Sequence, residues 1–178
     1  MIVLKHSSQE LTTGVLLCPF SIYPLAIMYL TLYGNPAWGD GVMSVEEELA
    51  EVSPEKDMLL TIGVFDGVHL GHKYLISRLT EQAKQQNLLS GVVTFRQHPR
   101  EVLSPQTKLP YLTNLVERAK LLREEGVEAV INLSFTQELA QFSARQFVGL
   151  LKKHLGMYGL IIGPDFALGR DREGNTNT

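Results

Sequence analysis

Residues 58–72 decide the fold, and they read Met-Leu-Leu-Thr-Ile-Gly-Val-Phe-Asp-Gly-Val-His-Leu-Gly-His. Residues 58–65 form a short, nearly continuous apolar run, which is typical of a strand buried on both faces of a parallel sheet. Beyond His72, apolar residues recur at helical spacing among charged ones, which predicts an amphipathic helix. His69 and His72 therefore stand where a buried strand gives way to a helix.

This position favours phosphate binding. A helix start carries unpaired N–H groups and the positive end of the helix dipole, which is worth about 0.3–1 kcal/mol to an anion. His69 and His72 are three residues apart, so both rings can point at one ligand, and Gly71 leaves room for that ligand to approach the backbone. The plainer alternatives are that the histidines are a helix cap or core residues, and that Asp66-Gly67 is only a turn.

Two further motifs follow in order. Residues 95–99 read Phe-Arg-Gln-His-Pro, and residues 163–169 read Gly-Pro-Asp-Phe-Ala-Leu-Gly. Together with residues 63–72 they resemble the FAD synthetase module of the bacterial bifunctional riboflavin kinase/FMN adenylyltransferases, in the nucleotidyltransferase superfamily with a His-x-Gly-His motif. The resemblance runs from Met43 to the end of the chain. Leu168 departs from it, because the family more often has an aromatic residue there, and so do Arg96 and Gln97, which replace a commoner acidic-proline pair.

The resemblance implies a Rossmann-like α/β fold, ATP and FMN as substrates, and Mg²⁺ bridging the ATP phosphates. It implies that His69 and His72 are catalytic, hydrogen-bonding the ATP phosphates and the departing pyrophosphate. Asp66 is expected to orient the loop or hold a metal-bound water, and no protein side chain is expected to be a direct metal ligand. The residues expected to bind nucleotide or flavin are Gly63, Phe65, Asp66, Gly67, Gly71, Phe95, His98, Pro99, Asp165 and Phe166.

Ordinary structural roles compete with some of these assignments. An aromatic residue at a strand end is commonly part of the core, so core packing is the alternative for Phe95 and Phe166. A turn is the alternative for Asp165, which lies in a glycine-rich segment.

The rest of the chain predicts alternating strands and helices. Strands are expected at 58–65, 88–95, 128–133 and 158–162, with helices between them. Ser44 and Ser143 are expected to begin helices, and Gly126 to end one. Such alternation implies a mostly parallel sheet with helices on both faces and ligands at the carboxyl ends of its strands. Because each motif follows a predicted strand, we expect all three to converge on one cleft.

Composition sets the remaining bounds. The chain has 178 residues, 44% of them hydrophobic, which suits one core, and its net charge of −3 disfavours nucleic-acid binding. Cys18 is the single cysteine, which excludes an intramolecular disulfide and fits a cytoplasmic location. Residues 14–33 are uncharged, but Pro19 and Pro24 argue against a membrane span, and the start of the chain is poor in the basic residues of a signal peptide.

We therefore expect a poorly packed N-terminal extension over residues 1–42 and a nucleotidyltransferase domain over 43–178. That domain is expected to be incomplete at its C-terminal end, because family members continue into an arginine-bearing segment and a riboflavin kinase barrel. Two alternatives to FMN adenylyl transfer stay open. One is another adenylyl- or cytidylyltransferase of the superfamily, and the other is a non-catalytic nucleotide- or flavin-binding fragment.

Overall fold

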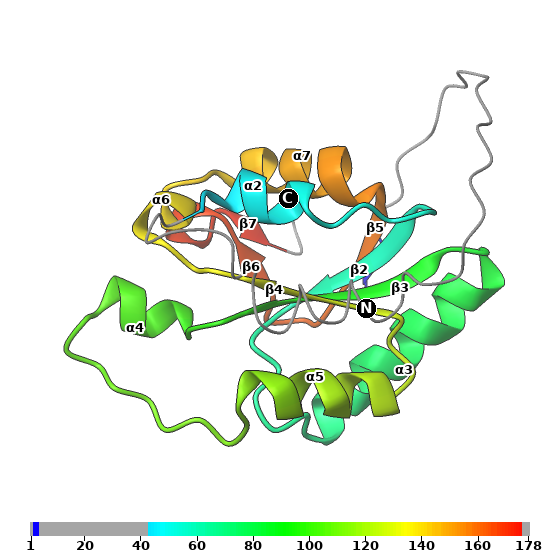
Figure 1. Ribbon diagram of the computed structural model, residues 1–178, viewed down its shortest axis with the longest axis horizontal. Helices are drawn as coiled ribbons and strands as arrows, with labels where there is room; N and C mark the ends of the chain where they lie inside the picture. Colours follow the sequence, from blue (N-terminus) through cyan, green and yellow to red (C-terminus); the bar gives the residue numbers. More distant parts are fainter. Residues whose placement is uncertain (1, 4–42, 176–178) are drawn as a thin grey trace.

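The computed structural model describes residues 2–3 and 43–175, and they build a five-stranded sheet between two helical layers and a small two-stranded sheet of β6 and β7 (Figure 1). The strand order is β1-β5-β2-β3-β4, and β2, β3, β4 and β5 are parallel. Their bounds are β1 Ile2–Val3, β2 Met58–Ile62, β3 Leu89–Phe95, β4 Ala129–Leu133 and β5 Met157–Ile162. The parallel sheet with helices on both faces confirms the predicted fold class.

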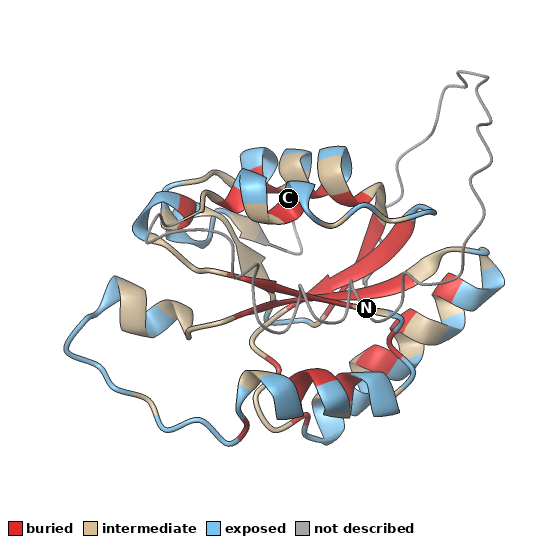
Figure 2. Ribbon diagram, viewed as in Figure 1, coloured by how far each residue is buried: buried red, intermediate tan, exposed pale blue. Residues whose placement is uncertain are grey.

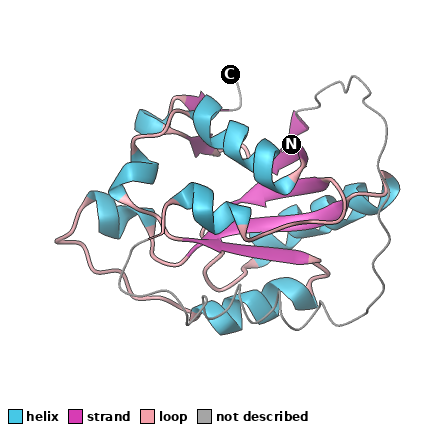
Figure 3. Cartoon of the chain, turned by 45° about the horizontal axis from the view of Figure 1, so that its top comes forward, coloured by secondary structure: helices cyan, strands magenta, loops and turns pink. Residues whose placement is uncertain are grey.

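Two pairs of helices cover the sheet (Figures 1 and 3). Helices α3 (Leu70–Gln85) and α5 (Leu115–Glu124) cover one face, and α2 (Val45–Ala50) and α7 (Ala144–Leu155) cover the other. Each face has its own apolar cluster, so the strands are buried from both sides (Figure 2). The shorter elements are α4 Pro99–Leu103, α6 Gln137–Ala140, β6 Ala167–Leu168, the 3-10 helix η1 Arg170–Arg172 and β7 Gly174–Asn175.

The predicted helix signals are confirmed. Ser44 and Ser143 each close a capping box, at the start of α2 and α7. Gly126 follows the end of α5 with a φ of 91°, a left-handed conformation that favours glycine. These signals depend on a few neighbouring residues, which is why the sequence alone locates them well.

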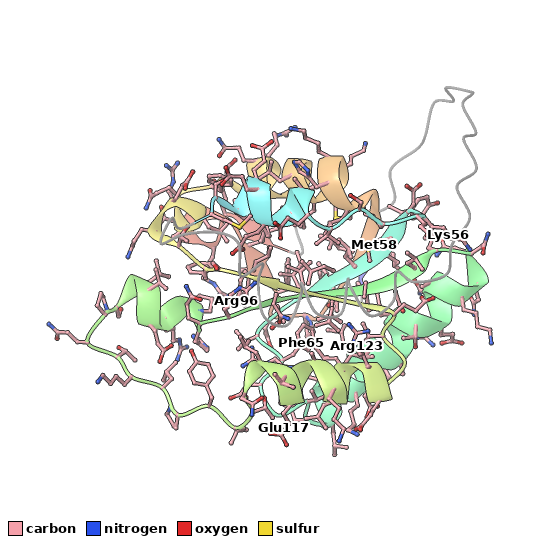
Figure 4. The ribbon with its side chains drawn as sticks, viewed as in Figure 1. Lys56, Met58, Phe65, Arg96, Glu117 and Arg123 are labelled. Carbon is pink, nitrogen blue, oxygen red and sulfur yellow. The ribbon has the colours of Figure 1, made fainter. Side chains whose placement is uncertain are left out.

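One predicted boundary was wrong. The apolar run predicted a strand through Phe65, whereas β2 ends at Ile62. Phe65 has a φ of 52°, outside any strand conformation, yet its side chain is fully buried between the sheet and the α3/α5 layer (Figure 4). The apolar run of residues 58–65 therefore predicts burial correctly, but residues 63–65 belong to a loop and not to the strand.

The N-terminal segment contributes one described element. Ile2 and Val3 form β1, which pairs antiparallel with Ile162 and Ile161 at the edge of the sheet beside β5. The expectation of a poorly packed extension, and the membrane-span and signal-peptide readings, concern residues 1–42, and apart from β1 these lie outside the described residues. Within residues 2–3 and 43–175, no helix has both the length and the apolar character needed to cross a bilayer.

The chain order creates a reversal between β2 and β5. From β2 the chain winds through α3 to β3 and through α5 to β4 on one face, then returns over the other face through α7 to β5, next to β2. In open parallel sheets, ligands bind at the carboxyl ends of the strands where the winding reverses. Here those ends lead into residues 63–72 and 163–166.

Candidate active site

The loop between β2 and α3 is strained. Phe65, Gly67 and Val68 have φ values of 52°, 74° and 39°. Positive φ is unfavourable for a phenylalanine and more so for the β-branched Val68, at a cost of roughly 1–3 kcal/mol for each such residue. Such a loop keeps its shape only when surrounding contacts hold it.

Asp66 supplies those contacts. Its Oδ2 accepts a hydrogen bond from the Leu112 backbone N–H at 2.8 Å, and its Oδ1 accepts from the backbone N–H and hydroxyl of Thr113 at 2.8 and 2.7 Å. Burial alone would raise the pKa of Asp66, but these hydrogen bonds outweigh it and hold the pKa below the usual value. Asp66-Gly67 is a turn, as the plainer reading proposed, and its carboxylate also fastens the loop to the segment before α5.

The two histidines lie together at the start of α3. His69 is the N-cap, and its Nδ1 accepts a hydrogen bond from the His72 backbone N–H at 3.4 Å. The two rings stack with centroids 3.6 Å apart, and the Phe65 ring lies 4.9 Å from His72 on the buried side. The His69 side chain is exposed. His69 therefore is a helix cap, as the plainer reading had it, and its ring still faces solvent, where a ligand can reach it.

His72 is a neutral imidazole near pH 7. Burial, and secondly the neighbouring His69, lower its pKa to about 4, although Asp66 opposes the shift. Its Nδ1 is buried and has no hydrogen-bond partner among the described residues. An unpaired buried polar atom is costly in a folded protein, which makes it a marker of function.

Two glycines shape this loop by what they leave empty. A Cβ on Gly71 would lie 3.2 Å from Cε1 and 3.3 Å from Nδ1 of the His69 ring, so the glycine allows the two rings to stack. A Cβ on Gly63 would lie 3.0 Å from the Phe65 ring, so this glycine allows Phe65 to fold back under the strand end.

The loop after β3 is tied to the segment before α5. His98 is the N-cap of α4, with its Nδ1 accepting from the Arg100 backbone N–H at 3.0 Å, and Pro99 occupies the first turn. The His98 N–H donates to the Tyr111 hydroxyl at 2.7 Å, and that hydroxyl donates to the Glu101 carboxylate. Burial, and then the charge of Arg100, lower the pKa of His98. His98 and Pro99 thus hold their loop in place.

The third motif forms the turn after β5. The Phe166 backbone N–H donates to the Gly163 carbonyl at 3.2 Å, and Arg172 donates to the Asp165 carbonyl at 3.3 Å. The Asp165 side chain is exposed, whereas Phe166 is half-buried against the α2/α7 cluster. Residues 163–166 follow the strand that neighbours β2, so this turn and the histidine loop lie at adjacent strand ends.

An aromatic cavity of about 270 Å³ lies between the ends of β3 and β4 and the β6/η1 segment. The predicted residue Phe95 lines it, with its ring edge-to-face against Phe135 at 5.3 Å. The other large apolar residues of its lining were not among the predicted site residues: Leu103, Phe135, Leu139, Phe142, Phe147 and Leu168. Phe135 follows β4 closely, so its position after a predicted strand was the available signal, whereas Phe142 comes after α6 and had no such signal. A larger open cleft of about 900 Å³ lies beside α5 and includes neither histidine.

The described residues do not build a dedicated metal site. No three histidine, cysteine, aspartate or glutamate side chains within residues 43–175 approach closely enough to hold an ion. Both carboxylate oxygens of Asp66 already accept hydrogen bonds.

Comparisons with known proteins agree with this geometry. The family model for FAD synthetase matches residues 51–178. The bifunctional riboflavin kinase/FMN adenylyltransferase of Escherichia coli strain K12 is 38% identical over 124 residues, which cover 69% of this chain and 40% of that protein. The protein of the same name from Pseudomonas fluorescens is 39% identical over 135 residues, covering 75% and 43%. The chain thus spans about two fifths of the length of these curated relatives.

A solved structure shares the fold. The crystal structure titled macrolide-efflux protein from Streptococcus pneumoniae aligns with a TM-score of 0.64 at 27% identity, covering 70% of this chain and 42% of that one. One assignment follows from the strand order, from the histidine loop at the reversal and from the family model, which spans most of the chain. The chain belongs to the FAD synthetase family.

Proposed function

We propose that this chain transfers the adenylyl group of ATP to FMN, giving FAD and pyrophosphate. The observation that carries the proposal is the stacked pair His69 and His72 at the start of α3, beside the winding reversal. The curated relatives are named for this activity together with riboflavin kinase, and the matched family is the FAD synthetase part alone. The proposal concerns that part.

The reaction needs charge neutralisation more than a protein nucleophile. An FMN phosphate oxygen attacks the α-phosphorus of ATP, a new P–O bond forms, and the bond to the β-phosphate oxygen breaks to release pyrophosphate. Negative charge grows on the leaving pyrophosphate, where preorganised N–H donors are most effective. The first backbone N–H groups of α3 and the ring of His69 can donate hydrogen bonds to this charge. His72, neutral when unliganded, gains a proton more readily once the phosphates lie beside it.

The aromatic cavity is the proposed flavin site. Its four phenylalanine rings and leucines suit a flat, largely apolar ring system, which buries most of its surface in such a pocket. Its lining comes from the end of β3 and from the segment after β5, and these two strands flank β2 in the sheet, so we propose that an FMN whose ring enters the cavity extends its phosphate toward the end of β2. Phe95 packs in the core and also lines the cavity, so core packing and the proposed flavin contact do not exclude each other.

Magnesium is proposed as part of the substrate. The described side chains form no group that could hold the ion, so we propose that Mg²⁺ arrives bound to the ATP phosphates. Mg²⁺ loses its bound waters slowly, and proteins commonly bind it through substrate phosphates. Small-molecule substrates and the single cysteine fit the proposed cytoplasmic location.

The test is direct formation of FAD. The purified chain is incubated with ATP, magnesium and FMN, and FAD and pyrophosphate are quantified after chromatographic separation. His72→Ala is expected to lower kcat/KM by about 10²–10³-fold, the usual cost of losing a preorganised donor. His154→Gln is the matched control, because His154 lies on α7 and contacts Glu46, away from the site.

Two outcomes would count against the proposal. Equal activity of the His72→Ala variant would remove the histidine mechanism. FMN binding without any turnover of the unmodified chain would favour the non-catalytic module instead.

A further inference from the structure

Arg118, on α5, is a fully buried cation. Its exposed fraction is 1%, although it stands among the apolar residues Ala119 and Leu122 on the inner face of the helix. Arginine is almost never buried to this extent unless its charge is paired and its N–H groups are bonded. Its Nε has no hydrogen-bond partner among the described residues, so the contacts of Nη1 and Nη2 indicate the role of the charge.

Those contacts join the ends of two strands. Nη1 donates to the Phe95 carbonyl at 2.9 Å and to the Thr94 hydroxyl at 3.4 Å, and the Thr94 hydroxyl donates to the Val64 carbonyl at 2.9 Å. Nη2 lies 3.9 Å from Oδ1 of Asp66. One guanidinium thus touches the end of β3 and, directly and through Thr94, the loop that follows β2.

This loop is the strained one that leads to the histidines. Phe65 and Val68 hold positive φ values, and Asp66 stands between them as the anchor. The donors to Asp66 are Leu112 and Thr113, both from the segment before α5, with Arg118 as the nearest cation. Strained backbone persists only where its surroundings over-determine it, and here those surroundings belong to α5 and the segment before it.

We propose that Arg118 is a positioning residue, which acts through Asp66 to hold residues 65–68 in the conformation that stacks His69 on His72. Because it also binds the Phe95 carbonyl, it fixes the histidine loop relative to the edge of the aromatic cavity. The catalytic consequence of this inference rests on the proposed function, but the conformational claim does not.

A role in stability alone would not require an arginine. Replacing both partners of a buried ion pair by apolar residues often costs no stability, so packing between α5 and the sheet does not by itself require an arginine. The planar fork of arginine instead lets Nη1 donate to the Phe95 carbonyl and the Thr94 hydroxyl while Nη2 places its charge 3.9 Å from Oδ1 of Asp66.

The test compares Arg118→Met, Arg118→Lys and Thr113→Val, with Arg123→Met as the matched control. Arg123 is an exposed arginine on the same helix. Three properties are measured in each variant. The first is the chemical shift of the ring protons of His69 and His72 without substrate, which ring stacking displaces. The second is kcat and KM for MgATP and FMN, and the third is thermal unfolding.

We expect Arg118→Met to remain folded, to lose the displaced histidine signals and to lose about 10²-fold in kcat with a smaller change in KM. Arg118→Lys should recover part of both, because it keeps the charge near Asp66. Thr113→Val, which removes one donor to Asp66, should move the same signals part of the way toward their unstacked positions.

Unchanged histidine signals in a folded Arg118→Met protein would overturn the inference. If that variant does not fold, unchanged signals in both Arg118→Lys and Thr113→Val would overturn it equally. If the unmodified chain forms no FAD but the Arg118→Met variant still loses the stacked histidine signals, the positioning role is supported while the proposed function fails.

Discussion

At His72, burial keeps an imidazole uncharged and thereby makes the stability of the fold depend on pH. Its pKa is about 4 in the folded chain against an ordinary value of 6.5. Above pH 6.5 the ring is neutral in both states and the effect vanishes. Between pH 6.5 and 4 the unfolded chain binds a proton that the folded chain refuses, so the free energy of unfolding falls as the pH is lowered.

The His72→Gln variant should therefore lose less stability than the unmodified chain over this interval. The measurement is the free energy of unfolding in urea at several pH values between 7 and 4, and the comparison is between slopes rather than absolute values. The pKa of His98 is lowered too, so its contribution remains in both proteins and cancels in the comparison. Parallel curves for the two proteins would show that His72 carries no such shift.

At Gly71, we expect a substitution to lower activity without lowering stability. In the Gly71→Ala variant the added Cβ would lie 3.2 Å from the His69 ring and push it off His72, while alanine suits the helix better than glycine. We expect FAD formation to fall about tenfold, since small misplacements of donors are costly, with no loss in free energy of unfolding. Both quantities are measured on the same preparation.

Gly149→Ala is the control for that substitution. Gly149 lies inside α7 and an added Cβ there meets nothing within 4 Å. It should gain about 0.5–1 kcal/mol of stability and keep its activity. Undiminished activity of the Gly71→Ala variant would mean that this glycine does not set the position of the His69 ring.

Among the elements, α2 is a short helix that carries core residues. It has 6 residues, and it buries Val45 and Leu49 against the α2/α7 face of the sheet. A helix this short depends on its ends and on packing, because nucleation is unfavourable. Its N-terminus is closed by Ser44, whose backbone N–H donates to the Glu47 carboxylate at 2.8 Å and whose hydroxyl accepts from the Glu47 N–H at 3.3 Å.

Ser44→Ala is expected to lower the free energy of unfolding by about 1 kcal/mol, the typical value of an N-cap. Ser53→Ala is the matched control, because Ser53 is exposed on the segment that follows α2, and exposed sites of this kind change stability by less than about 0.5 kcal/mol. Equal stabilities of the two variants in urea titration would show that the cap contributes nothing.

Across the whole molecule, local signals predicted the elements and long-range contacts decided the site. Alternating apolar runs and caps such as Ser143 depend on neighbouring residues, so the sequence locates strands and helix starts. The contact between Asp66 and the segment 46 residues later is invisible to any local pattern, and with it the role of Arg118. The same holds for Phe65, whose apolar character predicts burial but not a left-handed backbone. Phe142 and Phe147 join Phe95 only through the fold.

The winding reversal makes a prediction for the molecule as a whole. If one pair of substrates bridges the ends of neighbouring strands, a non-hydrolysable ATP analogue with magnesium and FMN should slow amide hydrogen exchange in residues 63–72 and 163–168 together. Residues 52–57 and 125–128 lie at the amino ends of β2 and β4, away from the carboxyl ends where the substrates are expected. They should exchange at unchanged rates, which makes them internal controls. Protection of only one of the two strand-end segments would place the substrates elsewhere, because separate sites have no reason to protect both.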